Sequence, residues 1–219
     1  MTELIREKAY HELRDMITHG DLNPGEKLVE TTLCKKLEIS RTPLREAIRQ
    51  LQMEGYVDAM DQKGVVVHKI TAEDVDAVYD ISSVLEGLAV ERAAVGIKPA
   101  DLKKLEKIYK DHQKTRKRRA ESSEIHEKTF QLNTAFHLFF AERCENPVLK
   151  KEIFKFRRIT YRSRYLIMSF ADSDELDYHG EILKAVKEKN AAKAGGLMVK
   201  HIRDKQKHIV AFLKNNRWF

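Results

Sequence analysis

The sequence predicts a mainly α-helical protein: three short helices with a small β-hairpin, followed by an all-α antiparallel helical bundle. Three observations predict this fold class. Apolar residues recur every three to four positions through most of the 219 residues, which is typical of amphipathic helices. The stretches that read as strands lie within residues 56–70, and the connectors between the later helical stretches are short. We expect one domain over residues 1–70 and a second over residues 71–219.

The composition is that of a globular protein with a well-solvated surface, since hydrophobic residues make up 42% and charged residues 34% of the chain. No run of about 18 apolar residues is present, and the opening MTELIREKAY carries charges where a signal peptide needs an apolar core. The two cysteines, Cys34 and Cys144, form no motif, which fits a reducing compartment better than a disulfide. We expect a cytoplasmic protein with no membrane partner.

The first domain begins with three helical stretches. Apolar spacing predicts a helix over residues 2–18 and a short helix over residues 31–39. A third helix is expected from about residue 43 to residue 54. Its start signals are Ser40 and Thr42 as N-cap residues and Pro43 in the first turn, and its end signal is Gly55.

A β-hairpin is expected after the third helix. The stretches YVDAM and VVVHKI read as strands, with Asp61 to Gly64 as the tip between them. Gly64 can take the positive φ that such a turn requires. Helix, short helix, turn, helix and hairpin form a winged helix-turn-helix, in which the second helix of the pair reads base edges in the major groove of DNA.

Arg41, Arg45 and Arg49 follow the third helix at a spacing of four residues, which puts them on one side, opposite the apolar face. Arginine can bond bidentately to guanine, and Thr42 with the helix N-terminus can bind phosphate. Further candidate contacts on the wing are Lys63, Gly64 and His68. The alternative is that the arginines only solubilise the surface. In this motif we predict that they bind double-stranded DNA.

Net charge does not locate the DNA-binding part. The chain carries a net charge of +7, but residues 1–70 hold 11 basic and 12 acidic residues and so contribute −1. The excess lies mostly in residues 98–120, which we interpret as the solvated face of an amphipathic helix. The local arginine pattern therefore carries the DNA-binding prediction.

The second domain reads as helices only. Thr71 is a good N-cap for the first of them, with Glu73 and Asp74 in its first turn. Later helices are expected over residues 100–119, 123–142, 147–168, 173–189 and 191–215. The short connectors between them favour an antiparallel bundle.

Four polar residues of the bundle form a candidate metal site. Asn133 and His137 are four residues apart and share a helix face, while His179 and His201 lie on consecutive helices of a hairpin. Three imidazoles and one oxygen ligand suit zinc or a similar divalent ion. The spacing alone leaves open that these are unrelated core or surface histidines. His112 is expected to face solvent.

Both halves resemble known families. The stretch NPGEKLVETTLCKKLEISRTPLREAIRQLQMEGYV, with KGVVV after it, resembles the DNA-binding domain of the GntR family of bacterial transcription regulators. This resemblance implies a homodimer that binds short palindromic operators. The stretch NTAFHLFFAERCENPVLKK, with His179 and His201 further on, resembles the FCD ligand-binding domain of the FadR subfamily. It implies that three histidines hold a divalent metal, such as zinc or nickel, often with a small carboxylate completing the shell.

Two residues depart from the FCD pattern. The first metal ligand in the family is usually Asp, and here Asn133 offers an amide oxygen without a charge. Many members have Arg where this chain has Ser82, at a position that faces the effector. Arg158 and Arg162 share a face of a later helix and are alternative effector-binding residues, although simple surface exposure also explains them.

We therefore predict a DNA-binding transcriptional regulator, expected to be a repressor, whose operator affinity is changed by a small metabolite such as an organic acid. A dimerisation scaffold without an effector is one alternative. A metal-dependent hydrolase or lyase with an accessory winged helix is another, but no motif places a nucleophile or a general base beside the histidines. We predict that the protein is not an enzyme.

Overall fold

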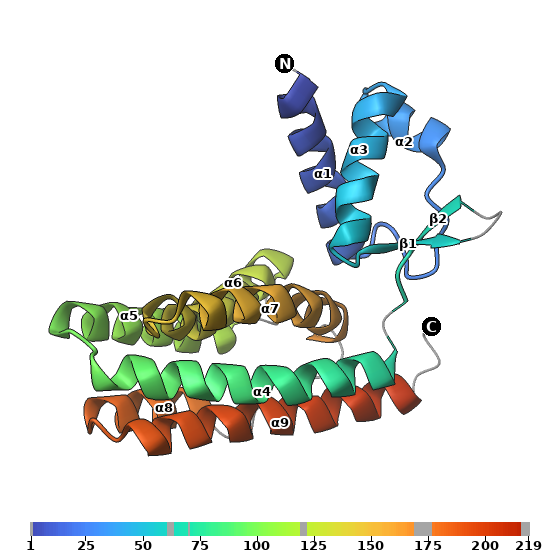
Figure 1. The fold of residues 1–219 in the computed structure, drawn as a ribbon. Coiled ribbons are helices and arrows are strands. Elements are labelled where there is room, and N and C mark those ends of the chain that lie inside the picture. The colour runs from blue at the N-terminus through green and yellow to red at the C-terminus, as the bar shows by residue number, and fades with distance from the viewer. Residues whose placement is uncertain (1, 61–63, 70, 119–121, 169–176, 216–219) are drawn as a thin grey trace.

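A computed structural model describes residues 2–60, 64–69, 71–118, 122–168 and 177–215. Its elements are, in order, α1 (Thr2–His19), α2 (Glu30–Leu37), α3 (Arg41–Met53), β1 (Val57–Met60), β2 (Gly64–Val67), α4 (Ala72–Val95), α5 (Pro99–Arg116), α6 (Ser123–Arg143), α7 (Pro147–Met168), α8 (Tyr178–Lys187) and α9 (Ala191–Asn215). Figure 1 shows α1 to β2 gathered beside one end of the bundle that α4 to α9 form. The predicted mainly α-helical fold class is confirmed.

One hydrophobic core holds the N-terminal elements together. α1 packs against α3, and Leu13, Leu44 and Leu51 are completely buried in this core. β1 and β2 pair as an antiparallel hairpin, and Gly64 takes a φ of +82°, as the sequence predicts for the turn. The core therefore fixes α3 and the hairpin as one unit.

The start of α3 differs from the prediction. The helix begins at Arg41, two residues earlier than expected. Ser40 is its N-cap but makes no side-chain capping hydrogen bond, and Thr42 lies within the first turn. Gly55 follows the end of the helix with a φ of +77°, as predicted.

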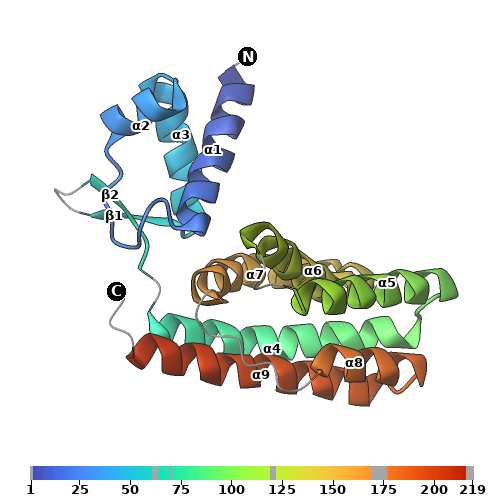
Figure 2. The ribbon, with the colours of Figure 1, turned by 180° about the vertical axis from the view of Figure 1, so that it is seen from behind.

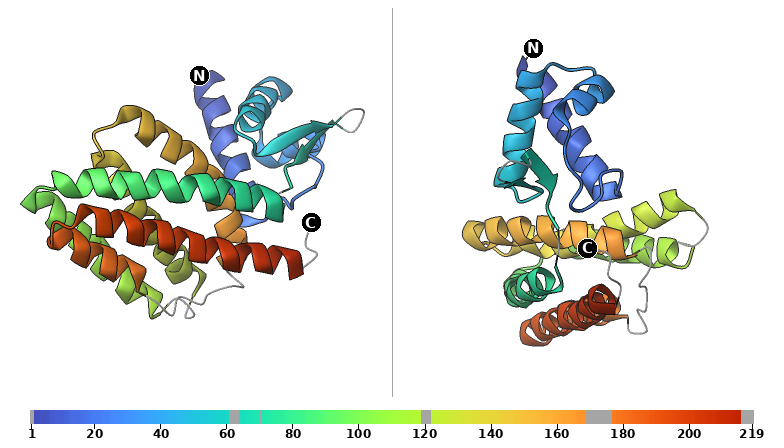
Figure 3. Two further views of the ribbon diagram at one scale, coloured as in Figure 1. Left: turned by 60° about the horizontal axis from the view of Figure 1, so that its bottom comes forward. Right: turned by 90° about the vertical axis from the view of Figure 1, so that its right-hand side faces the viewer.

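The bundle consists of two layers of helices. α4, α8 and α9 form one layer, and α5, α6 and α7 form the other (Figures 1 and 2). α4 and α9 run side by side along one face (Figure 3). They approach closely at Gly87 and Gly195, because a Cβ atom on Gly87 would lie 2.5 Å from Val199 Cγ2. The predicted N-cap of α4 is confirmed, since Thr71 Oγ1 accepts from Asp74 N at 3.0 Å.

Two expectations for the bundle need correction. The helix expected over residues 173–189 begins at Tyr178, after Asp177 as N-cap, and residues 169–176 lie outside the described residues. His112 does not face solvent: 5% of its surface is exposed, and its ring centroid lies 5.2 Å from that of His179. Among the described residues, no helix combines the length and the apolar character that crossing a membrane needs.

Candidate functional site

The outer face of α3 carries the residues predicted to read DNA. Leu44, Ala47, Ile48 and Leu51 are buried, because the helical repeat turns every third or fourth residue towards the core. The residues exposed away from the core include Arg41, Thr42, Arg45 and Arg49. The structure therefore gathers the four predicted helix contacts on one accessible surface.

Within the described part of the chain, Arg45 is the arginine of these three that has an ion-pair partner. Its Nε lies 2.9 Å and 3.0 Å from the two carboxylate oxygens of Glu30, the first residue of α2. The hydrogen bond to this carboxylate raises the pKa of the Arg45 guanidinium above its usual value. The cation on α3 is thus held by a carboxylate on α2, the helix that precedes α3.

The wing candidates lie at different ends of the hairpin. Gly64 is exposed and begins β2 next to the tip, whereas His68 follows the far end of β2. The Nδ1 atom of His68 lies 2.8 Å from Asp58 Oδ2, so this side chain already has a partner within the hairpin. Lys63 lies outside the described residues.

Three helices of the bundle bring His137, His179 and His201 together. All three are buried, and one ring nitrogen from each lies within 4.8 Å of the others. The two Nε2 atoms of His137 and His179 are 3.3 Å apart. Two ligands at about 2.0–2.1 Å in a tetrahedral zinc site are separated by about 3.4 Å, so this pair has the spacing of metal ligands.

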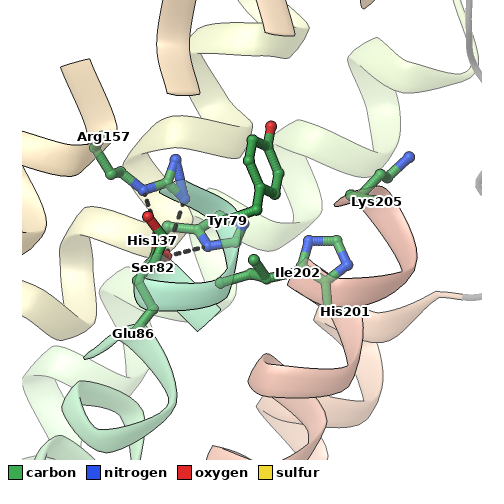
Figure 4. Close-up of a pocket in the computed structure, with 8 residues that line it drawn as sticks. All are labelled: Tyr79, Ser82, Glu86, His137, Arg157, His201, Ile202 and Lys205. Atoms are coloured by element: carbon green, nitrogen blue, oxygen red, sulfur yellow. Dashed lines mark hydrogen bonds and ion pairs between the residues drawn. The ribbon is translucent and has the colours of Figure 1, made fainter. Parts of the chain in front are cut away.

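A buried carboxylate orients His137. The Nδ1 atom of this histidine lies 2.7 Å from Glu86 Oε2. Arg157 binds the same carboxylate twice, from Nε to Oε1 at 3.0 Å and from Nη2 to Oε2 at 3.1 Å (Figure 4). A hydrogen bond from Nδ1 to a carboxylate leaves Nε2 of a histidine as the lone-pair donor, which is the usual arrangement behind metal-binding histidines.

Two further buried polar side chains fit a site that receives another group. Asn133 lies one helical turn before His137 on α6, and Ser82 lies one turn before Glu86 on α4. They are 4% and 3% exposed. Neither Asn133 Nδ2 nor Ser82 Oγ has a hydrogen-bond partner among the described residues. Because an unpaired buried polar group is costly, these two donors suit a site at which another molecule supplies the acceptors.

Ser82, Glu86, His137 and His201 line one small cavity between α4, α6, α7 and α9 (Figure 4). The other lining residues are Tyr79, Arg157, Ile202 and Lys205. The three histidines offer imidazole nitrogens, and Asn133 offers an amide oxygen, which are donor atoms that suit a divalent ion.

Sequence reasoning missed two members of this site. The prediction named Arg158 and Arg162, whose side chains lie outside the described residues, while the buried arginine is their neighbour Arg157. Glu86 was also missed as part of the site, although its spacing of four residues from Ser82 puts both on one face of α4. That spacing is the signal that could have found it.

Comparison with known proteins agrees with this arrangement. Residues 5–67 match the family described as bacterial regulatory proteins, gntR family, and residues 77–204 match the FCD domain. The HTH-type transcriptional regulator YdhC of Bacillus subtilis (strain 168) is 31% identical over 210 residues, which cover 95% of this chain and 92% of YdhC. The HTH-type transcriptional repressor GlaR of Escherichia coli (strain K12) is 26% identical over 202 residues, 89% of this chain and 90% of GlaR.

The fold is also found among solved structures. E. coli McbR/YncC superposes with a TM-score of 0.74 at 20% identity, over 96% of this chain and 97% of that chain. The family match over more than half of the chain and the full-length similarity to YdhC lead to the same assignment. The chain belongs to the GntR family of DNA-binding bacterial transcriptional regulators and carries an FCD effector-binding domain.

Proposed function

We propose that this regulator is a homodimeric repressor that binds a palindromic operator and responds to a small organic anion. Each subunit reads one half-site through Arg41, Arg45 and Arg49 on α3, with Thr42 binding phosphate. The exposure of all four residues on one face of α3 supports this role. Gly64, His68 and Lys63 are the proposed DNA contacts of the wing. We also propose that the DNA-binding domain covers residues 1–70 and the bundle domain residues 71–219.

A divalent metal, zinc or nickel, is the proposed cofactor of the bundle. His137, His179 and His201 would hold it, with the amide oxygen of Asn133 as a fourth ligand. The observation that carries the proposal is the convergence of three buried histidines, one ring nitrogen from each within 4.8 Å of the others. The bound ion supplies positive charge that attracts an anion. The side chains of the protein position the metal ligands: Glu86 orients His137, and Arg157 neutralises the charge of Glu86.

The effector is proposed to enter the cavity beside the histidines, where Ser82 offers a hydroxyl. Arg158 and Arg162 remain proposed effector contacts from α7. α4 lines this cavity with Ser82 and Glu86 and begins directly after the wing, so a shift of α4 would change the orientation of the reading helices. A coupling of about 1–3 kcal/mol is enough to change operator affinity roughly 5- to 150-fold.

Metal content tests the cofactor. Purified protein should contain about one zinc or nickel ion per chain by mass spectrometry, and the His137→Ala and His179→Ala variants should lose it. His208→Ala, an exposed histidine on α9, is the matched control and should keep the ion. A protein that takes up no zinc or nickel, even after supplementation, would overturn the metal assignment.

Operator binding tests the reading helix. Arg45→Ala should abolish specific binding while the dimer and its melting temperature stay unchanged, because Arg45 is exposed and contributes no core packing. Arg203→Ala, an exposed arginine on α9, serves as the control that keeps operator affinity. Retained operator affinity in Arg45→Ala would contradict the assignment.

A further inference from the structure

A stripe of lysines follows the solvated face of α5. Its members recur every three or four residues, so they lie on one side of the helix, and all of them are exposed. The opposite side of α5 holds Leu105 and His112, which are 0% and 5% exposed. The lysine stripe consists of Lys103, Lys107, Lys110, Lys114 and Lys117. It is about 21 Å long, because an α-helix rises about 1.5 Å per residue.

The acidic residues of α5 do not neutralise this stripe. Asp101 Oδ1 lies 3.0 Å from Arg143 Nη2, and Glu106 Oε1 lies 2.7 Å from Lys187 Nζ. Asp111 is exposed at the edge of the stripe. Within the described residues, no lysine of the stripe forms an ion pair. Like charges at this spacing destabilise a helix, and a face that serves only solubility usually mixes both signs. The stripe therefore fits a partner that presents a row of negative charges.

The residues around the stripe favour DNA as this partner. A helix that binds a membrane surface needs apolar side chains beside its basic ones, but Leu102, Leu105 and Ile108 pack against the core of the bundle. Interfaces between proteins are depleted in lysine and centre on aromatic and arginine anchors, which the stripe does not contain. A DNA backbone requires only positive charge, and about 21 Å of duplex carries about 12 phosphates.

The position of α5 also favours DNA. The ring of His112 contacts that of His179 on α8, in the other layer of the bundle, so the stripe on the opposite side of α5 faces outward. In Figure 1, α1 to β2 lie on the outer side of the layer that α5, α6 and α7 form, and α1 packs against α7. α4, with its 24 residues, separates α5 from the wing. The stripe is therefore on the DNA-binding side of the bundle but apart from α3.

We propose that the lysine stripe of α5 binds the phosphate backbone of duplex DNA outside the half-site that α3 reads. Lysine suits this role, since its ammonium group is a compact charge that contacts phosphate without reading a base. The stripe adds affinity that does not depend on sequence, while the arginines of α3 supply the discrimination. This role goes beyond the proposed function and does not rest on the metal or the effector.

Two full-length variants test the proposal. In the stripe variant, all five lysines of the stripe are replaced by glutamine, which has a similar helix propensity. The control variant loses the same charge from exposed positions on α7, α8 and α9. Its substitutions are Lys150→Gln, Lys151→Gln, Lys184→Gln, Lys193→Gln and Lys214→Gln. Circular dichroism melting establishes that both variants are folded.

Fluorescence anisotropy measures binding to a labelled duplex of random sequence over a range of KCl concentrations. With a duplex of about 60 base pairs, the stripe variant should bind at least about tenfold more weakly than the control variant. The slope of log K against log[KCl] should be shallower by about 4–5, because each contact between lysine and phosphate contributes about 0.9. A duplex of about 20 base pairs spans only two half-sites one turn apart, so with it the two variants should differ by less than about twofold.

The other outcomes would overturn the proposal. Equal slopes in the wild type and the stripe variant would mean that the stripe is only a solvated face. An equal loss in the control variant would assign the effect to net charge. The same loss with the short duplex would place the stripe on the half-sites themselves. Binding of the wild type to vesicles of phosphatidylcholine and phosphatidylglycerol, lost in the stripe variant while DNA binding is unchanged, would identify a membrane surface instead. None of these results would change the role proposed for the arginines of α3.

Discussion

Glu30 and Arg45 connect the two helices of the helix-turn-helix through an ion pair on its outer surface. Both carboxylate oxygens of Glu30 accept from the single Nε–H of Arg45, at 2.9 Å and 3.0 Å. Because a guanidinium has five N–H donors, this arrangement uses one and leaves those of the two terminal nitrogens for a base. The side chain of Arg45 is thereby oriented before it meets DNA.

Glu30→Gln should therefore reduce base discrimination more than affinity. The glutamine keeps the size of the side chain but no longer fixes the guanidinium, and it removes a negative charge near the phosphates. We expect the ratio of operator to scrambled-sequence affinity to fall by about tenfold, with non-specific affinity unchanged or higher. Fluorescence anisotropy with both DNAs at one salt concentration measures the ratio.

Glu46→Gln is the control for this prediction. Glu46 is an exposed acid on α3, the helix that carries Arg45, and replacing it removes the same charge. In Glu46→Gln, the ratio of operator to scrambled-sequence affinity should stay close to that of the wild type, although the non-specific affinity should rise as in Glu30→Gln. An unchanged ratio in Glu30→Gln would mean that the ion pair does not orient Arg45 for reading.

The buried pair of Glu86 and Arg157 gives a prediction for stability. The two side chains are 5% and 9% exposed and share two hydrogen bonds. Arg157→Met removes the counter-charge and leaves a buried carboxylate, which should lower the free energy of unfolding by about 3–5 kcal/mol. Urea denaturation of the metal-free protein measures the loss.

The double variant identifies the cause of this loss. Glu86→Gln with Arg157→Met removes both charges, so it should be less destabilised than the sum of the two single variants. Additive losses would mean that the two side chains stabilise the bundle independently, through their packing. The comparison also shows how far the orientation of His137 depends on an intact pair, since metal content can be measured in the same samples.

The hydroxyl of Tyr10 on α1 donates to Glu54 Oε2 at 2.7 Å, at the end of α3. Burial and the adjacent carboxylate raise the pKa of Tyr10 to about 12, from about 10 in an unfolded chain. A raised pKa in the folded state contributes stability that is complete below pH 10 and is lost as the pH rises towards 12. The contact between α1 and the reading helix should therefore weaken in strong alkali.

Tyr10→Phe tests this contact. At neutral pH the variant should lose about 0.5–1.5 kcal/mol of unfolding free energy, because one partly buried hydrogen bond is removed. Between pH 10 and pH 11.5 its urea midpoint should fall less steeply than that of the wild type, since one raised pKa has been eliminated. Parallel curves for the two proteins over this range would contradict the role assigned to Tyr10.

Local signals in the sequence were enough to predict the N-terminal unit. The periodic apolar residues of α3, the glycine of the hairpin tip and the arginine spacing are all set by neighbours within a few positions, and the structure agrees with them. The predicted start of α3 lay two residues too late. Ser40 and Thr42 are both good capping residues, and which of them caps the helix depends on the preceding turn.

The interior of the bundle was harder to predict. Asn133 and His137 follow from a spacing of four residues, but Glu86 and Arg157 meet His137 only because α4 and α7 pack against α6. A charged residue in an amphipathic helix reads as solvent-facing until its partner on another helix is known. His112 was misplaced for the same reason, since its burial comes from the contact with α8.

The last prediction concerns the proposed homodimer. Ile81, Val84 and Leu88 recur at helical spacing on the outer face of α4, where they are 47%, 56% and 43% exposed. Such a stripe on an otherwise charged surface is typical of an interface that a second copy covers. In Figure 3, α4 runs beside α9 along one face of the bundle, and we propose that two subunits meet on this face around a two-fold axis.

Val84→Glu should therefore convert the dimer to a monomer, because it inserts a charge at the centre of this stripe. Val148→Glu is the matched control: Val148 is 69% exposed on α7, and its replacement should leave the dimer intact. Sedimentation velocity measures the mass of both variants. A monomeric Val84→Glu should bind one half-site only, so its operator affinity should fall even though α3 is unchanged. A dimeric Val84→Glu would exclude this face of α4 as the interface.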